Sequence, residues 1–465
     1  QTAALGEAMR SYRSFQLPGI DMLCGSREFT TAKQAQSAVH QYGRPGMTSE
    51  LYGVTGWDFD FRGHKLHGDW QAALGVTVRV QHLAWVSMKG EAKRDYPASI
   101  NDQSPWWQDY AYVEDHFARL NTALTRGKPV VRVGVIHPVE SYWLHWGPAE
   151  QTDGIRRQMD ERFQSLTDWL VNGGVDFDFL CESLLPSQCP QGGAPLRVGE
   201  MAYDAVVVPG CETLRSTTLE RLEAFQRAGG RLIFLGDAPR YTDAKPDERG
   251  SRLYEQSRHT EFSREALLDA LEPVRLIDIR DENGVRTDNL LHQLRQDGDG
   301  LWLFLAHSRE PYNNDVPTRQ NIRLTVKGAY HARVYDTLTG DILPANAEIQ
   351  GDKTVIRATL YDHDSLLLRL DHEPALPRTE NEGAAASRTV SVPSLVHYVL
   401  DEPNALLLDK AEYALDQGEY QPEEEILRAD NALRRELGWP LRMDAMAQPW
   451  TVKEEKTEHT VRLRF

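Results

Sequence analysis

The segment from residue 129 to residue 275 constrains the fold most strongly, because it alternates apolar strands with amphipathic helices. Strands are predicted at 130–136, 175–180, 203–208 and 231–235, with helices at 156–171 and 217–228. Continuous apolar strands separated by helices are typical of a parallel sheet that is covered on both faces. We therefore expect residues 129–275 to form a doubly wound, flavodoxin-like domain. The first strand is not followed by a GxGxxG phosphate loop, so a structural or oligomerisation role is predicted for this domain.

The residues before this segment predict part of a (β/α) barrel. Residues 1–128 are rich in Trp, His and Gly, and irregular loops connect their predicted elements. Helices are expected near Thr30, over 64–74 and over 110–126, and a strand over 76–80. Strands and helices in this order, with unusual residues in the loops, are typical of the C-terminal part of such a barrel.

The residues after it predict β-structure. Five segments alternate apolar and polar residues between Gly, Asp and Asn turns, at 300–306, 321–326, 332–335, 354–360 and 365–370. This pattern predicts an antiparallel β-sandwich over 276–374. Residues 375–390 are predicted as a linker and 391–465 as a helical connector that leads into a further β-domain. In that last part we expect a helix over 423–437 and a strand over 460–465 that has nothing after it to pair with.

Length and charge exclude several classes of protein. At roughly 150 residues per domain, the 465 residues suggest about three domains. The net charge of −17 disfavours nucleic acid and anionic membrane surfaces as partners, because both need clustered Lys and Arg. No apolar run approaches the roughly 18 residues of a membrane span. Four cysteines without a CxxC pair, and no HxH or HExxH motif, predict neither a metal site nor a cofactor.

The beginning of the chain lacks the basic and apolar stretches of a signal peptide, which favours a cytoplasmic location. The chain starts at Gln1 rather than Met, so we expect that the first residues of the gene product are absent.

Tryptophan is concentrated in one part of the chain. Seven of the eleven Trp residues lie between Trp57 and Trp146. Aromatic residues ordinarily fill cores, but here they stand beside His, Asp, Glu and Gly in irregular segments. Sugar rings stack on indole faces, and carboxylates bind sugar hydroxyls. We therefore predict a carbohydrate site whose substrate-binding residues are Trp57, Asp58, His82, Trp106 and Trp107.

The segment 48–58 predicts a catalytic carboxylate. It places Glu50 at a strand end before a glycine-flanked loop, where barrels carry such groups. Glycoside hydrolysis typically uses two carboxylates, and we predict Glu50 as the acid that protonates the glycosidic oxygen. The second carboxylate stays open among Asp58, Asp60, Asp69, Glu91, Asp95, Asp102, Glu114 and Glu140.

Several of these segments look familiar. Ser49-Glu50-Leu51-Tyr52-Gly53 and Ser104-Pro105-Trp106-Trp107, followed by a flavodoxin-like domain, resemble large bacterial glycoside hydrolases with a (β/α)8 barrel. The second domain, with Glu140-Ser141-Tyr142-Trp143 after its first strand, resembles the amidotransferase-like trimerisation domain of family 42 β-galactosidases. The loops of the first 128 residues resemble α-L-rhamnosidase-like hydrolases of the family 106 type.

The resemblance implies a glycosidase that acts on plant or microbial oligosaccharides and forms a homo-oligomer through its flavodoxin-like domain. Two departures stand out. Such barrels usually carry Asn-Glu at the acid position, where this chain has Ser49-Glu50. A complete barrel needs about 250 residues, whereas 128 precede the second domain. We therefore expect that half of the barrel is missing or is supplied by another chain, as in a truncated or divided hydrolase.

Two alternatives come from other classes of function. A non-catalytic carbohydrate-binding or assembly protein on a decayed barrel would bind oligosaccharides without turnover. An amidotransferase would use Cys211, which follows Pro209-Gly210 at a strand end, together with a histidine partner. After Cys211, His259 is the first histidine in that domain.

Overall fold

The computed structural model describes residues 6–21, 27–87, 97–313, 316–373, 391, 395, 397–399, 408–441 and 458–465. The chain forms two compact units, the first from 1–86 and 96–376 and the second from 87–95 and 377–465. The whole is a mixed α/β structure of several sheets, none of which is closed in the described residues. The predicted linker at 375–390 lies outside those residues.

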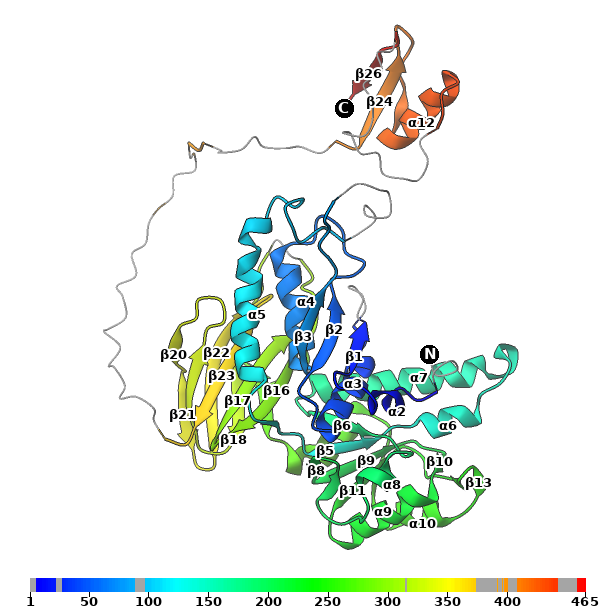
Figure 1. Ribbon diagram of the computed structural model, residues 1–465, viewed down its shortest axis with the longest axis vertical. Helices are drawn as coiled ribbons and strands as arrows, with labels where there is room; N and C mark the ends of the chain where they lie inside the picture. The colour runs from blue at the N-terminus through cyan, green and yellow to red at the C-terminus, as the bar shows by residue number, and fades with distance from the viewer. Residues whose placement is uncertain are drawn as a thin grey trace. The chain divides into compact units, whose positions relative to one another are not determined.

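The first unit begins with a small parallel sheet that has helices on one face (Figure 1). After α2 (Ala8–Tyr12), the strands β1 (Gly19–Asp21), β2 (Met47–Leu51) and β3 (Val76–Gln81) lie side by side in that order. They alternate with α3 (Phe29–Gln41) and α4 (Phe61–Ala73), and α5 (Ala111–Leu124) follows the short helix η2 (Trp107–Tyr110). Alternate strand residues such as Met47 and Val76 share a core with these helices. The other face of the sheet carries the intervening residues, Glu50 among them.

A second, larger parallel sheet follows. It contains β5 (Val133–Ile136), β6 (Phe177–Leu180), β9 (Ala205–Pro209), β11 (Arg231–Leu235) and β14 (Arg258–Thr260), in the order β14-β11-β9-β5-β6. Its alternating residues enter two cores. One core includes α7 (Ala149–Asn172) and α11 (Arg264–Leu271), and the other includes α8 (Leu185–Gln188), α9 (Ser216–Arg227) and α10 (Arg249–Glu255). Helices therefore cover both faces, as the continuous apolar strands predict.

The segment that forms the second parallel sheet also contains several short elements. They are α6 (Val139–Leu144), the 3-10 helix η3 (Glu272–Val274), the hairpin of β7 (Leu196–Val198) and β8 (Met201–Tyr203), and a small sheet of β10 (Thr213–Leu214), β12 (Tyr241–Thr242) and β13 (Lys245–Pro246).

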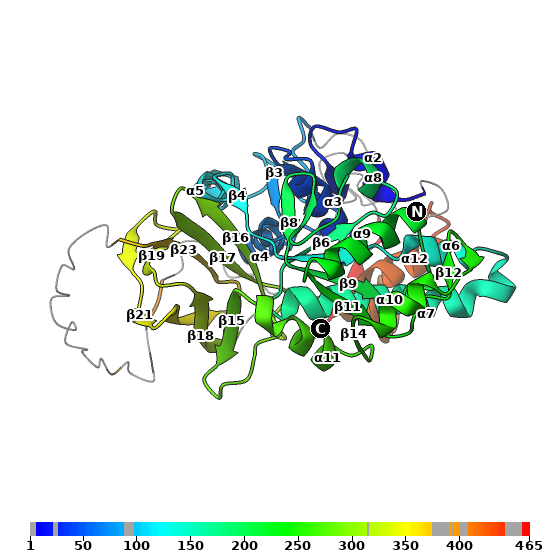
Figure 2. The same cartoon turned by 90° about the horizontal axis from the view of Figure 1, so that it is seen from below.

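Two antiparallel sheets complete the first unit, and they face each other across one apolar core (Figure 2). One sheet has the order β15 (Ile277–Asp281), β18 (Arg319–Lys327), β22 (Lys353–Tyr361), β21 (Ala347–Gln350). The other has the order β20 (Ile342–Pro344), β19 (His331–Tyr335), β23 (Ser365–Asp371), β17 (Gly300–His307), β16 (Leu290–Asp297), β4 (Lys128–Pro129). Strand β17 is buried along its whole length, because its second face packs against α4. The sandwich thus packs against α4, one of the helices that cover the small parallel sheet.

The second unit corrects two predictions. It contains β24 (Lys410–Leu415), β25 (Gln421–Glu425), α12 (Ile426–Glu436) and β26 (Val461–Arg464). The last strand is not unpaired as predicted, since β26 pairs antiparallel with β24 and aligns Tyr413 with Leu463. The helix begins three residues later than predicted, because the Glu425 carboxylate caps it by accepting the N–H groups of Leu427 and Arg428. None of the helices in the described ranges has both the length and the apolar character needed to span a bilayer.

Candidate active site

Glu50 lies at the carboxyl end of β2, the central strand of the small parallel sheet. The register aligns it with Asp21 on β1 and with Val80 on β3. Residues in register on neighbouring parallel strands point to the same face, and the strands are about 4.8 Å apart. Asp21, Glu50 and Val80 are exposed, so this face of the sheet is open in the described residues. Two carboxylates therefore stand side by side where parallel α/β sheets place their active sites.

Asp21 was missed by reasoning from the sequence. Strand β1 has only three residues, which is too short for an alternating pattern to reveal it. The sequence did contain one indication of its position. Asp21 is the last residue of β1, and Glu50 is the last residue but one of β2, so both strands carry an acidic residue at their carboxyl end.

The loop after β2 is strained. Tyr52 has φ 72° and Val54 has φ 61°, and this left-handed region is unfavourable for a β-branched residue. The Thr55 hydroxyl fixes the turn by donating to the Tyr52 carbonyl at 2.6 Å. Tyr52 is buried, and burial raises the pKa of its phenol, which accepts a hydrogen bond from Arg79 Nη1 at 3.3 Å. Strain of this kind costs about 1–3 kcal/mol per residue and clusters at functional sites.

Aromatic rings connect the loops around Glu50. The ring of Trp57, after β2, lies 6.1 Å from that of Trp85, after β3. Tyr52 contacts His64 at a centroid distance of 4.5 Å, and His64 lies 5.8 Å from Trp106. Trp57 is 37% exposed, and its indole is available at the same edge as Glu50.

The tryptophans of this part of the chain differ in their exposure. Trp107 is 44% exposed, whereas Trp106 is half-buried and packs edge-on against Phe61 at 5.5 Å. Trp70 is fully buried in the core against Phe29, which is the ordinary structural role of an aromatic side chain.

His82 continues β3 beside the Glu50 loop. Its backbone N–H donates to the Leu51 carbonyl at 2.8 Å. Strand alternation from Val78 and Val80 places His82 on the Glu50 face of the sheet. Its Nδ1 is buried and has no hydrogen-bond partner among the described residues.

The other acidic candidates differ in their surroundings. Asp60 caps α4 by accepting the Gly63 N–H at 3.0 Å. Asp69 is buried between Lys65 Nζ at 2.6 Å and His116 Nε2 at 2.7 Å. Burial opposes its ionisation, but these two partners outweigh it and lower the pKa of Asp69 to about 2. Both carboxylates have structural partners that account for them.

The remaining candidates lie elsewhere. Glu114 pairs with Arg79 at 2.5 Å on the helix side of β3, and Glu140 pairs with Arg215 at 2.6 Å beside the second parallel sheet. Asp58 and Asp102 are exposed in loops. Glu91 and Asp95 lie outside the described residues. Among these candidates the structure brings none into register with Glu50, and Asp21 takes that position instead.

Cys211 lacks the environment of an activated nucleophile. Its thiol is buried, and burial raises its pKa. A nucleophilic thiol needs a nearby base to form the thiolate. The nearby His145 Nε2 bonds Glu212 at 2.6 Å, and in the described part of the chain no histidine hydrogen-bonds the Cys211 Sγ. No group of three or more His, Cys, Asp or Glu side chains in that part could hold a metal ion.

No family model and no curated protein matches the chain. Among the solved structures that share its fold are three with a TM-score of at least 0.50. A rhamnosidase from Novosphingobium sp. PP1Y has a TM-score of 0.58 and 16% identity, over 88% of this chain and 38% of that one. A β-galactosidase from Bacillus circulans sp. alkalophilus has a TM-score of 0.51 and 12% identity, over 78% of this chain and 61% of that one. A GH42 β-galactosidase from G. stearothermophilus has a TM-score of 0.50 and 10% identity, over 78% and 61%.

These structures confirm the predicted resemblance to a rhamnosidase and to family 42 β-galactosidases at the level of fold. The chain spans between 38% and 61% of the length of these three proteins.

Proposed function

We propose that this chain is a glycoside hydrolase, or a part of one, that cleaves a glycosidic bond of an oligosaccharide at the open face of the β1–β2–β3 sheet. One observation carries the proposal, namely the register that aligns the exposed Asp21 and Glu50 at the carboxyl end of neighbouring strands. Trp57 follows β2 and His82 follows β3, so both come after the carboxyl end of the strands that carry or adjoin Glu50, and Trp57 offers an exposed indole. The strained turn at Tyr52 and Val54 supports a functional role for the same loop.

We propose a retaining mechanism. Neighbouring strands are about 4.8 Å apart, a backbone spacing from which the Asp21 and Glu50 carboxyl groups can come within the roughly 5–5.5 Å that retaining enzymes need. Glu50, as the acid, protonates the glycosidic oxygen while Asp21 attacks the anomeric carbon. The bond to the leaving group breaks and a glycosyl ester of Asp21 forms. Glu50 then takes a proton from water, which hydrolyses the ester.

The open face also supports the idea of a divided or longer barrel. In closed barrels this face is filled by side chains from all eight strands. Here Val78 is 39% exposed and Val80 is 50% exposed, although both alternate as interior residues do. We propose that further strands, from a longer polypeptide or a second chain, cover this face and line the substrate site.

Hydrolysis of alkyl glycosides, whose leaving group needs a proton, tests the proposal. The protein is assayed on methyl α-L-rhamnoside, methyl β-D-galactoside and related sugars. Glu50→Gln and Asp21→Asn are each expected to lower kcat/KM by about 10²–10⁴-fold, the usual contribution of an acid–base group. Glu161→Gln, at an exposed position of α7, serves as the matched control. Wild-type turnover in Glu50→Gln contradicts the assignment of Glu50 as the acid. If Glu50→Gln loses activity and Asp21→Asn keeps it, the nucleophile is a carboxylate other than Asp21.

Binding without turnover is the second candidate function. The open sheet favours it, because a face with three strands offers fewer groups than a closed barrel. Oligosaccharide binding that is retained in Glu50→Gln, with no hydrolysis by the wild type, would identify a binding or assembly protein.

A further inference from the structure

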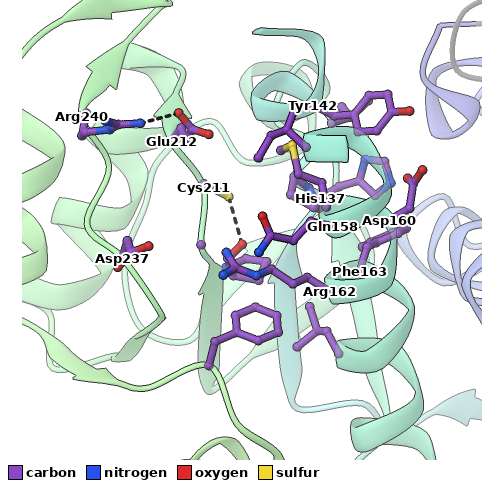
Figure 3. Close-up of a pocket in the computed structure, with 18 of the residues that line it drawn as sticks. His137, Tyr142, Gln158, Asp160, Arg162, Phe163, Cys211, Glu212, Asp237 and Arg240 are labelled. Carbon is purple, nitrogen blue, oxygen red and sulfur yellow. Dashed lines mark hydrogen bonds and ion pairs between the residues drawn. The ribbon is translucent and has the colours of Figure 1, made fainter. Parts of the chain in front are cut away.

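A cavity of about 530 Å³ lies at the carboxyl end of the second parallel sheet (Figure 3). In that sheet, β5 lies between β6, which follows it in the chain, and β9, which comes later. The connections after β5 and β9 therefore leave on opposite sides of the sheet, and the crevice between them is where open α/β sheets bind ligands. His137 after β5, Cys211 after β9 and Asp237 after β11 line the cavity. The volume lies within the usual range of about 300–1,000 Å³ for small-molecule sites.

Helix α7 forms the opposite wall. Figure 3 shows Gln158 and Arg162 extending from α7 toward the end of β9, near Cys211. Phe163, one residue further on α7, is held by ring contacts with His137 at 5.3 Å and with Phe179 at 5.1 Å. Phe262 faces the cavity from the loop before α11 and lies 5.5 Å from the Arg162 guanidinium. The wall therefore combines fixed aromatic rings with amide and guanidinium donors.

The charges around the cavity disfavour an anion. Asp160, Glu212 and Asp237 contribute three carboxylates, against the two guanidinium groups of Arg162 and Arg240. Arg240 is already paired with Glu212 at 2.7 Å. Phosphate sites need unpaired positive charge or a loop of backbone N–H groups, and the loop after β5 has no glycine-rich sequence.

The floor of the cavity is polar but uncharged. Burial lowers the pKa of His137 to about 4, so its ring is neutral near pH 7. Its Nε2 lies 2.9 Å from the Gln34 amide nitrogen, which donates to it. The Cys211 thiol, which also lines the cavity, is buried, and burial raises its pKa so that it is protonated near pH 7. A ligand that both donates and accepts hydrogen bonds without carrying charge suits this floor.

We propose that this cavity binds a neutral sugar, a mono- or disaccharide, at a site that does not contain Asp21 or Glu50. Carboxylates, amides and guanidinium groups together match hydroxyls, which both donate and accept. The Phe163 and Phe262 rings supply apolar surface for the C–H faces of a sugar ring. A nucleotide is the ligand that this type of crevice usually takes, and the charge balance at this cavity disfavours its phosphate. The proposal does not depend on hydrolysis at Glu50.

Calorimetric titration of the full chain tests the proposal, with L-rhamnose, D-galactose, lactose, adenosine and AMP as probes. Gln158→Trp fills the cavity from an exposed position on α7 and is expected to weaken sugar binding by about tenfold or more, or 1.4 kcal/mol. Gln164→Trp is the matched control, because Gln164 is exposed on the same helix and does not line the cavity. It is expected to leave the affinity unchanged.

Each outcome decides between sites and ligands. Sugar binding that survives in Glu50→Gln but is lost in Gln158→Trp supports the proposal, even if the chain hydrolyses nothing. Binding that is lost in Glu50→Gln and kept in Gln158→Trp overturns it, because the sugar then occupies the open face of the small sheet. Binding of adenosine or AMP in preference to all three sugars, or of none of the probes, also overturns it.

Discussion

The buried carboxyl group of Glu182 gives a pH-dependent contribution to stability that a single substitution isolates. Glu182 follows β6 and is 2% exposed. Its Oε2 accepts the Arg215 backbone N–H at 2.7 Å. Burial penalises the charged form more than this hydrogen bond favours it, so the pKa of Glu182 rises from 4.5 to about 7. The folded protein therefore holds a proton at pH 6 that the unfolded chain has lost.

The sign and the size follow from linkage. A raised folded-state pKa contributes stability that is fully present below pH 4.5 and is lost as the pH rises through about 7. At 1.36 kcal/mol per pKa unit, the loss between these limits is about 3 kcal/mol. Glutamine has the same shape and cannot ionise. The free energy of unfolding of Glu182→Gln, relative to wild type, is therefore expected to increase by about 3 kcal/mol from pH 4.5 to 7 and to be constant outside that window.

Urea unfolding of both proteins, measured every half unit from pH 4 to 8.5, tests this prediction. Other titrating groups cancel in the difference, so a constant offset between the two proteins does not matter. Glu161→Gln, which is exposed on α7, should give a difference that does not vary with pH. Parallel pH profiles for wild type and Glu182→Gln would refute the reasoning, since they would mean that Glu182 ionises equally in the folded and unfolded chains.

Four further predictions concern the first unit. Asp69→Asn should lower the free energy of unfolding by about 3–5 kcal/mol, because it leaves a buried pair broken; urea unfolding measures this. Gly68→Ala should destabilise the protein by about 1–3 kcal/mol, since its Cβ would lie 2.1 Å from the Phe117 ring. Gly154→Ala, with nothing within 4 Å of its Cβ, should gain about 1 kcal/mol in the same measurement. If Glu50 is the acid, Glu50→Ala should keep kcat/KM for dinitrophenyl glycosides near the wild-type value, because their leaving group needs no proton, while kcat falls as the glycosyl ester accumulates; hydrolysis of methyl glycosides should be lost.

Strongly patterned elements could be predicted from the sequence. The strand β11 was predicted with its observed bounds, because the run Arg231–Leu235 is apolar and glycines flank it on both sides. Helix α7 begins at Ala149, seven residues before the predicted start at 156. Its first turns are mostly exposed, so they carry no apolar stripe for a periodic pattern to detect.

The candidate site could be predicted only in part. Glu50 was found because a strand end and a glycine-flanked loop mark it locally, whereas Asp21 reaches it through a pairing of β1 with β2 that no local pattern encodes. The concentration of tryptophan was an ambiguous indication of a carbohydrate site, since Trp70 lies in the core and Trp57 at the surface. Local sequence cannot separate these two, because the difference arises from which helix or loop packs over each ring.

The exposed valines of β3 link the fold to the proposed function. Val78 and Val80 alternate with Arg79, which points to the helix side and pairs with Glu114. The alternation therefore gives the face opposite the helices two apolar side chains, yet this face is uncovered in the described residues. β-Branched residues favour strands because they pack against neighbours on the pleated surface, so the two exposed valines agree with the covering strands proposed above. Because Glu50 lies on the same face, we expect those strands to border the proposed substrate site as well.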